Sequence, residues 1–195
     1  MYRTSLSVFI LCLLAMSLIA CGGSGGMRGK INDARIGIGA GGTALKAADT
    51  VVSDLYEDAP PEDTEAYCRN KIAGLIFTQV KVVLVNAEDV VVLWEDAWLI
   101  QQANKEAGEE TPLDEGNVLS SESDWMRILT DVAAVLHGMW ATLKLWIPDK
   151  IPTIVDYAVS LIVGLSGKPV VEYPWDWTDL EGSVCMDYLP GGGGS

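Results

Sequence analysis

The chain has 195 residues, enough for one domain with a real core, and its formal net charge is −14. Such an acidic composition excludes nucleic acid as a partner, because binding to phosphates requires a surface rich in Lys and Arg. The single histidine, His137, falls on a polar row of a predicted helix. A single histidine in this position argues against a zinc site, which needs several ligands, and against serine–histidine catalysis, which needs an imidazole in a cleft.

The N-terminus has the pattern of an export signal. One charged residue, Arg3, precedes an uncharged and mostly apolar run over residues 6–19, which is too short to span a bilayer but suits a signal-peptide core. The run closes on Leu18-Ile19-Ala20-Cys21, which resembles the lipobox of bacterial lipoproteins. An ordinary secretory signal would prefer a small residue where Leu18 stands.

The resemblance to bacterial lipoproteins implies lipidation at Cys21. Residues 1–20 would be removed as the signal peptide, and the Cys21 thiol would carry diacylglycerol, because a thiolate is the required nucleophile. The membrane would then be a partner through this anchor, on the periplasmic side of the envelope. In enteric lipoproteins an aspartate directly after the lipidated cysteine resembles a signal for retention in the inner membrane. This chain has Gly22 at that position, so the outer membrane is favoured.

Residues 21–30 are predicted to form a flexible tether. The stretch "GGSGGMRG" at 22–29 reaches only about 15 Å as a random coil, so the module would sit near the membrane. Arg28, Lys30 and Arg35 follow the anchor closely, where they could rest on anionic headgroups. Without Arg3 of the signal, 12 basic residues remain against 27 acidic ones, and the mature chain carries −15.

Two cysteines remain after Cys12 leaves with the signal and Cys21 is acylated. Cys68 and Cys185 are an even pair in an oxidising compartment, which predicts a disulfide between the middle of the chain and its end. Closing so long a loop stabilises a fold by about 4 to 5 kcal/mol in the loop-entropy description. The alternative is two buried free thiols.

The first predicted helix begins at about Ile31. Its apolar residues recur every seven positions in two rows, which is typical of a helical seam. The rows are Ile31, Ile38, Leu45 and Val52, and Ala34, Gly41, Ala48 and Leu55. Each glycine in the stretch 37–42 costs about 1 kcal/mol against alanine, so the part from Thr43 to Asp58 is the secure helix and the part before it is expected to fray.

A second helix is predicted from Thr64 to about Lys105. Polar residues recur seven apart along it, at Lys81, Glu88, Glu95 and Gln102, with Asp89 and Asp96 beside them. One polar stripe on an otherwise apolar rod predicts a mostly buried helix. The competing interpretation is a β-hairpin, since seven valines fall within residues 80–93, but the sevenfold spacing extends past both supposed strands.

Two further helices are expected after an acidic loop. Ser121 and Asp124 resemble a capping box at the start of the third helix, which Pro148 ends. Its apolar rows are Trp125, Val132, Met139 and Trp146, and Leu129, Leu136 and Leu143. A fourth, shorter helix is predicted from about Pro152 to Ser166, so the bundle would comprise residues 31–168.

The tail over residues 169–190 is predicted to be irregular and folded back onto the bundle. Its aromatic and acidic residues Tyr173, Trp175, Asp176 and Trp177 are the candidate site for a protein partner, because such rings anchor interfaces. The alternative is that these rings close the open end of the bundle beside the Cys68–Cys185 link. The final "GGGGS" at 191–195, whether native or added, carries no fold information.

No catalytic, metal-binding or cofactor-binding residue is predicted. Gly37, Gly39 and Gly42 match G-x-G-x-x-G, but that pattern needs a buried strand before it, and "KINDAR" is too polar for one. The acidic loop with Glu109 and Asp114 does not have the ligand spacing of a calcium-binding EF-hand. Nothing singles out a pair of carboxylates for glycoside hydrolysis.

These patterns predict an all-α protein, an antiparallel bundle of about four helices with an irregular C-terminal tail. The leading hypothesis for its function is a non-enzymatic envelope lipoprotein that acts as a protein-binding or structural module. A second hypothesis is a phage- or prophage-encoded lipoprotein for superinfection exclusion or lysis. A third is a hydrolase that uses two carboxylates in a groove of the bundle.

Overall fold

The computed structural model describes residues 27–56, 64–108, 122–147, 160 and 172–190. All regular secondary structure in these residues is helical, as the sequence predicts. The long helices are α2 (Met27–Tyr56), α3 (Thr64–Glu106) and α4 (Glu122–Trp146), and two short 3-10 helices follow, η1 (Thr178–Leu180) and η2 (Val184–Tyr188). The fourth helix expected at 152–166 lies outside the described residues except for residue 160.

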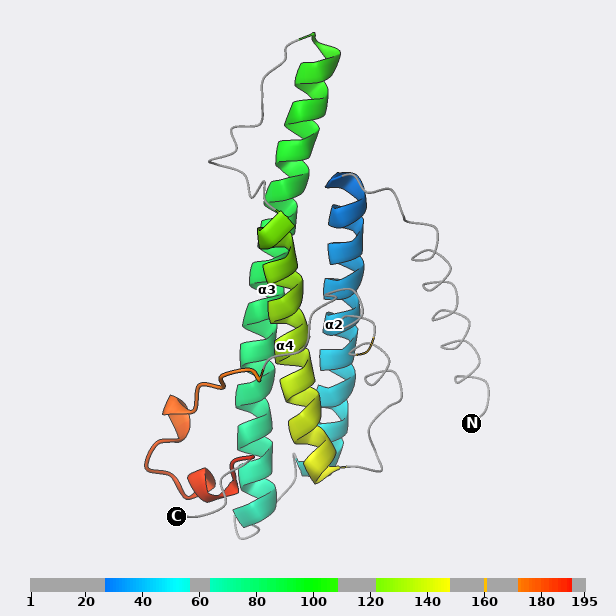
Figure 1. The fold of residues 1–195 in the computed structure, drawn as a ribbon. Helices are drawn as coiled ribbons and strands as arrows, with labels where there is room; N and C mark the ends of the chain where they lie inside the picture. Colours follow the sequence, from blue (N-terminus) through cyan, green and yellow to red (C-terminus); the bar gives the residue numbers. More distant parts are fainter. Residues whose placement is uncertain (1–26, 57–63, 109–121, 148–159, 161–171, 191–195) are drawn as a thin grey trace, which may run out of the picture.

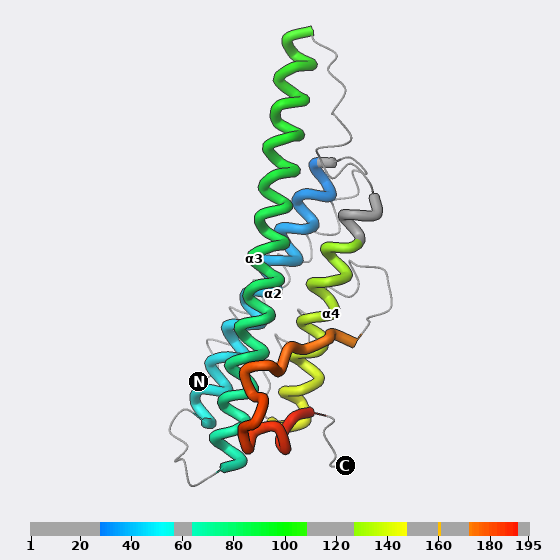
Figure 2. The backbone as a smooth tube through the Cα atoms, turned by 90° about the vertical axis from the view of Figure 1, so that its left-hand side faces the viewer, coloured from blue at the N-terminus to red at the C-terminus, as the bar shows by residue number. Residues whose placement is uncertain are grey.

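The three long helices lie lengthwise beside one another, with α3 in contact with both α2 and α4 (Figure 1, Figure 2). At one end of α3, Arg28 of α2 lies 5.8 Å from the centre of the Trp98 ring, and Arg35 forms a double hydrogen bond with the Glu95 carboxylate. At the other end, Arg69 of α3 donates to the Tyr56 hydroxyl. The last turns of α3 extend past the start of α2 (Figure 1).

The core is made by the apolar rows that the sequence predicts for α2 and α4. Ile31, Ala34 and Val52 of α2 are buried, and so are Leu136 and Met139 of α4. On α3 the buried side chains recur at helical spacing, from Ile76 and Val80 through Leu84, Ala87 and Val91 to Trp94. This burial confirms the helix over residues 80–93 and shows that the hairpin interpretation is wrong. Packing of one face outweighs the strand propensity of valine.

Two expectations about the start of α2 are wrong. Residues Met27–Lys30, assigned to the tether, belong to the helix. The helix also continues without a break through the glycine-rich stretch 37–42, where fraying was expected. Buried side chains before and after the glycines, Ile31, Ala34 and Ala44, gain more from packing than the glycines lose in helix propensity.

The expectation that α3 is mostly buried is also wrong. One face of α3 is buried, but the opposite face exposes large apolar side chains, among them Val82, Leu93 and Ile100. The polar row that the sequence predicts does lie outward, with Lys81 and Glu88 exposed. It therefore occupies only part of the solvent-facing surface of this helix.

Helix α4 ends at Trp146, two residues before Pro148, as expected. Within the described part of the chain, the segment Arg127–Trp146 is the one helix whose length and apolar composition would suffice to cross a membrane. The core helix of a soluble protein passes the same test, and 61% of the apolar window is buried against the rest of the protein. Val132, Val135 and Leu136 are fully buried, which fits a core helix.

Candidate binding site

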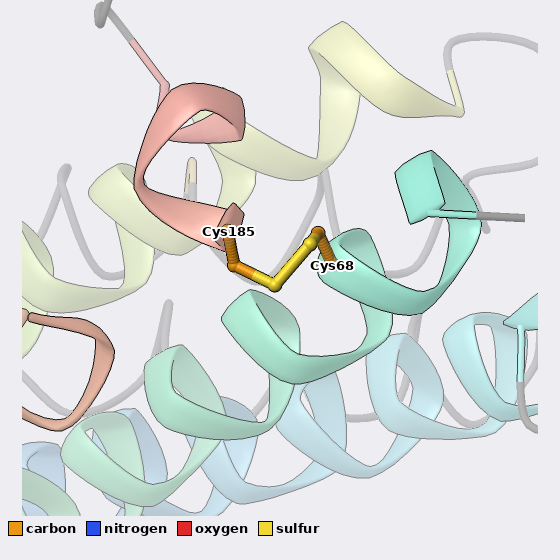
Figure 3. Close-up of a disulfide and its surroundings, with 2 residues drawn as sticks. All are labelled: Cys68 and Cys185. Atoms are coloured by element: carbon orange, nitrogen blue, oxygen red, sulfur yellow. A yellow bond between two sulfur atoms is a disulfide. The ribbon is translucent and has the colours of Figure 1, made fainter. Parts of the chain in front are cut away.

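The C-terminal tail is held to α3 by a disulfide, as the sequence predicts. The Sγ atoms of Cys68 and Cys185 lie 2.09 Å apart, at bonding distance, and the sequence separation of the two cysteines is 117 (Figure 3). Cys68 lies in the second turn of α3 and Cys185 in η2, and both are buried. Leu180, which is also buried, adds an apolar contact from η1.

A pair of hydrogen bonds positions the middle of the tail on α3. The backbone amide of Asp176 donates to Oε1 of Gln79, and Nε2 of Gln79 donates to the carbonyl oxygen of Asp176, both at 2.9 Å. The side-chain amide thus satisfies both backbone groups of a residue that belongs to no helix or strand. Gln79 therefore places Asp176 beside the first half of α3.

The exposed Asp176 carboxylate is turned back onto the tail itself. Its Oδ1 atom accepts a hydrogen bond from the Thr178 hydroxyl at 2.5 Å and another from the Thr178 backbone amide at 3.0 Å. Because both bonds favour the charged form, they lower the pKa of Asp176 below its ordinary value of 3.8. The carboxylate thus forms a local side-chain turn with the first residue of η1.

The three rings of the tail form a row, and Tyr173 and Trp175 lie against α4. Tyr173 and Trp175 meet edge to face with centroids 4.7 Å apart, and Trp175 and Trp177 are 6.1 Å apart. A Cβ built on Gly138 of α4 would lie 3.0 Å from Cζ2 of Trp175, so the ring lies directly over this glycine. Burial, with the negative charge of Asp131, raises the pKa of the Tyr173 phenol above 10.0.

The structure therefore brings together the four residues predicted as a partner site, Tyr173, Trp175, Asp176 and Trp177. The three rings are half-buried and pack against the core cluster. Figure 2 shows this part of the tail lying across the helices. The rings are therefore packed, as the alternative expects, but they lie along the helices at Gln79 and Gly138 and not over an open end of the bundle.

The other residues weighed in the sequence are placed apart from this tail or outside the described residues. His137 is exposed on α4, as its helical row predicts. Gly39 and Gly42 lie inside the continuous helix α2, so they form no glycine turn that could hold a pyrophosphate. No group of three or more His, Cys, Asp or Glu that could hold a metal occurs within the described ranges. Glu109 and Asp114 of the acidic loop lie outside the described residues.

Sequence reasoning missed a groove between α2 and α3. It has a volume of about 560 Å³, with Ile38, Leu45 and Leu84 on its walls and Val85 at its edge. Gly39 and Gly42 line it, and a Cβ on either glycine would meet no atom within 4 Å. The signal in the sequence was the glycine pair one helical turn apart on the edge of the apolar face.

Sequence reasoning also missed the apolar outer face of α3. Six large side chains of this face are between 42% and 63% exposed. They are Val82, Val85, Val92, Leu93, Leu99 and Ile100. Exposed apolar surface of this extent on one helix is typical of an interaction site.

No protein-family model, no curated protein and no solved structure matches this chain.

Proposed function

We propose that the protein is a lipid-anchored lipoprotein of the bacterial envelope, that it catalyses no reaction, and that it acts by binding another envelope protein. The anchor is Cys21, in the lipobox-like sequence Leu18-Ile19-Ala20-Cys21. The observation that carries the binding function is the outer face of α3, where six large apolar side chains are exposed. A surface of this kind in water is stabilised when a partner covers it.

The position of α2 supports a role close to the membrane. Only six peptide units separate Cys21 from Met27, the first residue of α2, so the start of the helix lies within about 22 Å of the anchor. Arg28 and Lys30 follow directly, and both are accessible to anionic headgroups. Gly22 at the second mature position favours the outer membrane.

The proposed architecture is an antiparallel bundle of four helices. The three described helices supply one common core, and the apolar spacing of residues 152–166 supports a fourth helix that would add to it. The disulfide between Cys68 and Cys185 holds the tail to this assembly. Such an assembly would present its surface close to the membrane.

Two matched cysteine variants test the anchor. Cys21→Ser should abolish lipidation and leave the unprocessed precursor as the main form. Treatment with globomycin should block only the cleavage of the natural chain, so its precursor should also accumulate. Cys12→Ser, within the signal peptide, should leave processing and the membrane fraction unchanged. Mass spectrometry of the mature N-terminus checks the modification, and a Cys21→Ser protein that is processed and fractionates like the natural one would refute the anchor.

Chemical crosslinking of intact cells tests the binding function. The protein should give a specific crosslinked species of higher mass that contains a second envelope protein. An unrelated lipoprotein serves as the control. If the protein gives no crosslinked species above the background of that control, the proposal is contradicted.

A further inference from the structure

The outer face of α3 has the spacing of a coiled-coil seam. Val82, Val85, Val92 and Leu99 lie on one line of the helix, on the side opposite the buried face. With Asp89 and Asp96 they are separated by steps of three, four, three, four and three residues, which is the a and d spacing of a heptad repeat. We call these six residues, Val82, Val85, Asp89, Val92, Asp96 and Leu99, the outer seam.

The outer seam is long enough for a partner helix. Its 17 residue steps cover about 26 Å at the rise of an α-helix, or nearly five turns. Leu93 and Ile100 flank the seam and are 63% and 62% exposed, so they widen its apolar surface. Val85 also borders the groove between α2 and α3, which gives the seam a concave edge.

Two carboxylates decide what kind of helix fits. Asp89 and Asp96 are exposed, occupy successive a positions of the seam, and form no ion pair with any residue in the described ranges. In a parallel pair of copies each aspartate would face its own equivalent, and like charges at that position repel. Anionic headgroups would also be repelled, and burial of an unpaired carboxylate in hydrocarbon is costly.

We infer that the outer seam docks an amphipathic helix of a partner protein whose apolar face carries Lys or Arg at two positions seven residues apart. Basic side chains at that spacing would meet Asp89 and Asp96 while apolar side chains cover Val85, Val92 and Leu99. This is recognition of a helix on an apolar surface, with the charge pairs selecting the partner and its register. The inference rests on the proposed function and names the chemistry of its partner.

A defined peptide pair tests the charge rule. The probe is a fluorescent helical peptide of three heptads with Leu at d and Lys at a, and its matched control has Glu at a. The full chain in non-ionic detergent should bind the Lys peptide at least about tenfold more tightly than the Glu peptide, because close charge pairs at interfaces contribute this much or more. The double variant Asp89→Lys/Asp96→Lys should reverse that preference.

A charge-matched control separates the seam from the overall acidity of the chain. Asp54→Lys/Glu181→Lys changes the net charge equally at two exposed positions away from the seam, and it should keep the preference of the natural chain. Far-UV circular dichroism should show that both double variants are folded. If the control reverses the preference as fully as the seam variant does, or if neither does, the inference is wrong.

Crosslinking in the cells that carry the gene tests the natural partner. Leu93 is replaced by the photoreactive p-benzoylphenylalanine in the full chain, and the crosslinked segment is read by mass spectrometry. A basic amphipathic segment, lost with Asp89→Lys/Asp96→Lys, supports the inference. A second copy of this chain, a lipid, or an acidic segment at this position overturns it.

The outcomes also separate this inference from the proposed function. If the same photoreactive residue captures an envelope protein at Trp177 but none at Leu93, the binding function stands and the outer seam is not the site. If the seam captures a basic helix while Cys21→Ser stays processed and membrane-bound, the seam stands and the lipid anchor is wrong.

Discussion

The same substitution, glycine to alanine inside a helix, should have opposite effects at two places in this protein. Gly39 and Gly42 lie inside α2, and a Cβ on either would meet no atom within 4 Å. Alanine favours a helix interior over glycine by about 1 kcal/mol. Gly39→Ala/Gly42→Ala should therefore raise the free energy of unfolding by about 2 kcal/mol.

Gly138→Ala should lower the free energy of unfolding. The new Cβ would lie 3.0 Å from Cζ2 of Trp175 and 3.4 Å from Cβ of Tyr173, so the tail must shift to admit it. Overpacking typically costs about 1 to 3 kcal/mol, which exceeds the gain of about 1 kcal/mol in helix propensity. The expected net loss is about 1 kcal/mol.

Urea denaturation followed by far-UV circular dichroism measures these differences, and tryptophan fluorescence reports the tail. Gly74→Ala in α3 is the matched control, because a Cβ there also meets no atom within 4 Å and should stabilise by about 1 kcal/mol. A Gly138→Ala protein as stabilised as Gly74→Ala would show that Trp175 does not lie on α4. A destabilised Gly39→Ala/Gly42→Ala protein would show that another segment fills the groove over α2.

Three further predictions concern the tail. Replacing both Cys68 and Cys185 by Ala opens a loop with a sequence separation of 117. The free energy of unfolding should fall by about 5 kcal/mol, to the value measured for the natural chain with its disulfide reduced. A loss below about 1 kcal/mol would contradict the disulfide. Gln79→Ala removes both hydrogen bonds to the Asp176 backbone, so hydrogen exchange at that amide should accelerate about tenfold, and an unchanged rate would speak against the pairing. NMR titration should place the pKa of Asp176 below 3.8, and Thr178→Val should raise it toward 3.8. Since the pKa of Asp176 is lowered in the folded state, the stabilisation from its ionised form is present above pH 3.8 and is lost as the pH falls through the folded-state pKa. A measured pKa of Asp176 at or above 3.8 would refute the hydrogen bonds from Thr178.

Most of the helical framework could be predicted from spacing alone. The sevenfold rows of α2 and α4 predict the buried face of each helix, because a helix brings residues seven apart onto one face, although Leu45, Leu55 and Trp146 are only partly buried. The same spacing separated helix from hairpin over residues 80–93. The pairing of Cys68 with Cys185 was predicted on the expectation that Cys12 leaves with a signal peptide and Cys21 is acylated, which leaves one pair.

The candidate sites were less predictable. The sequence presents Tyr173, Trp175 and Trp177 as a plausible exposed cluster, but their exposure depends on Gln79 and Gly138, which are distant in the chain. The spacing of Val85, Val92 and Leu99 in the outer seam is visible in the sequence. Because apolar residues occur on all sides of α3, the sequence does not indicate which face stays exposed. That choice is made by the helices that pack on α3.

The sequence by itself determined the helices, their buried rows and the one cysteine pair, because these follow from local periodicity and residue chemistry. Only the tertiary structure decided that α2 continues through residues 37–42, since burial of side chains on both sides of the glycines compensates for their low propensity. It also decided that the aromatic tail packs on the helices while Leu93 and Ile100 remain exposed. An apolar residue is buried only where another element covers it, and spacing along one chain segment does not specify that element.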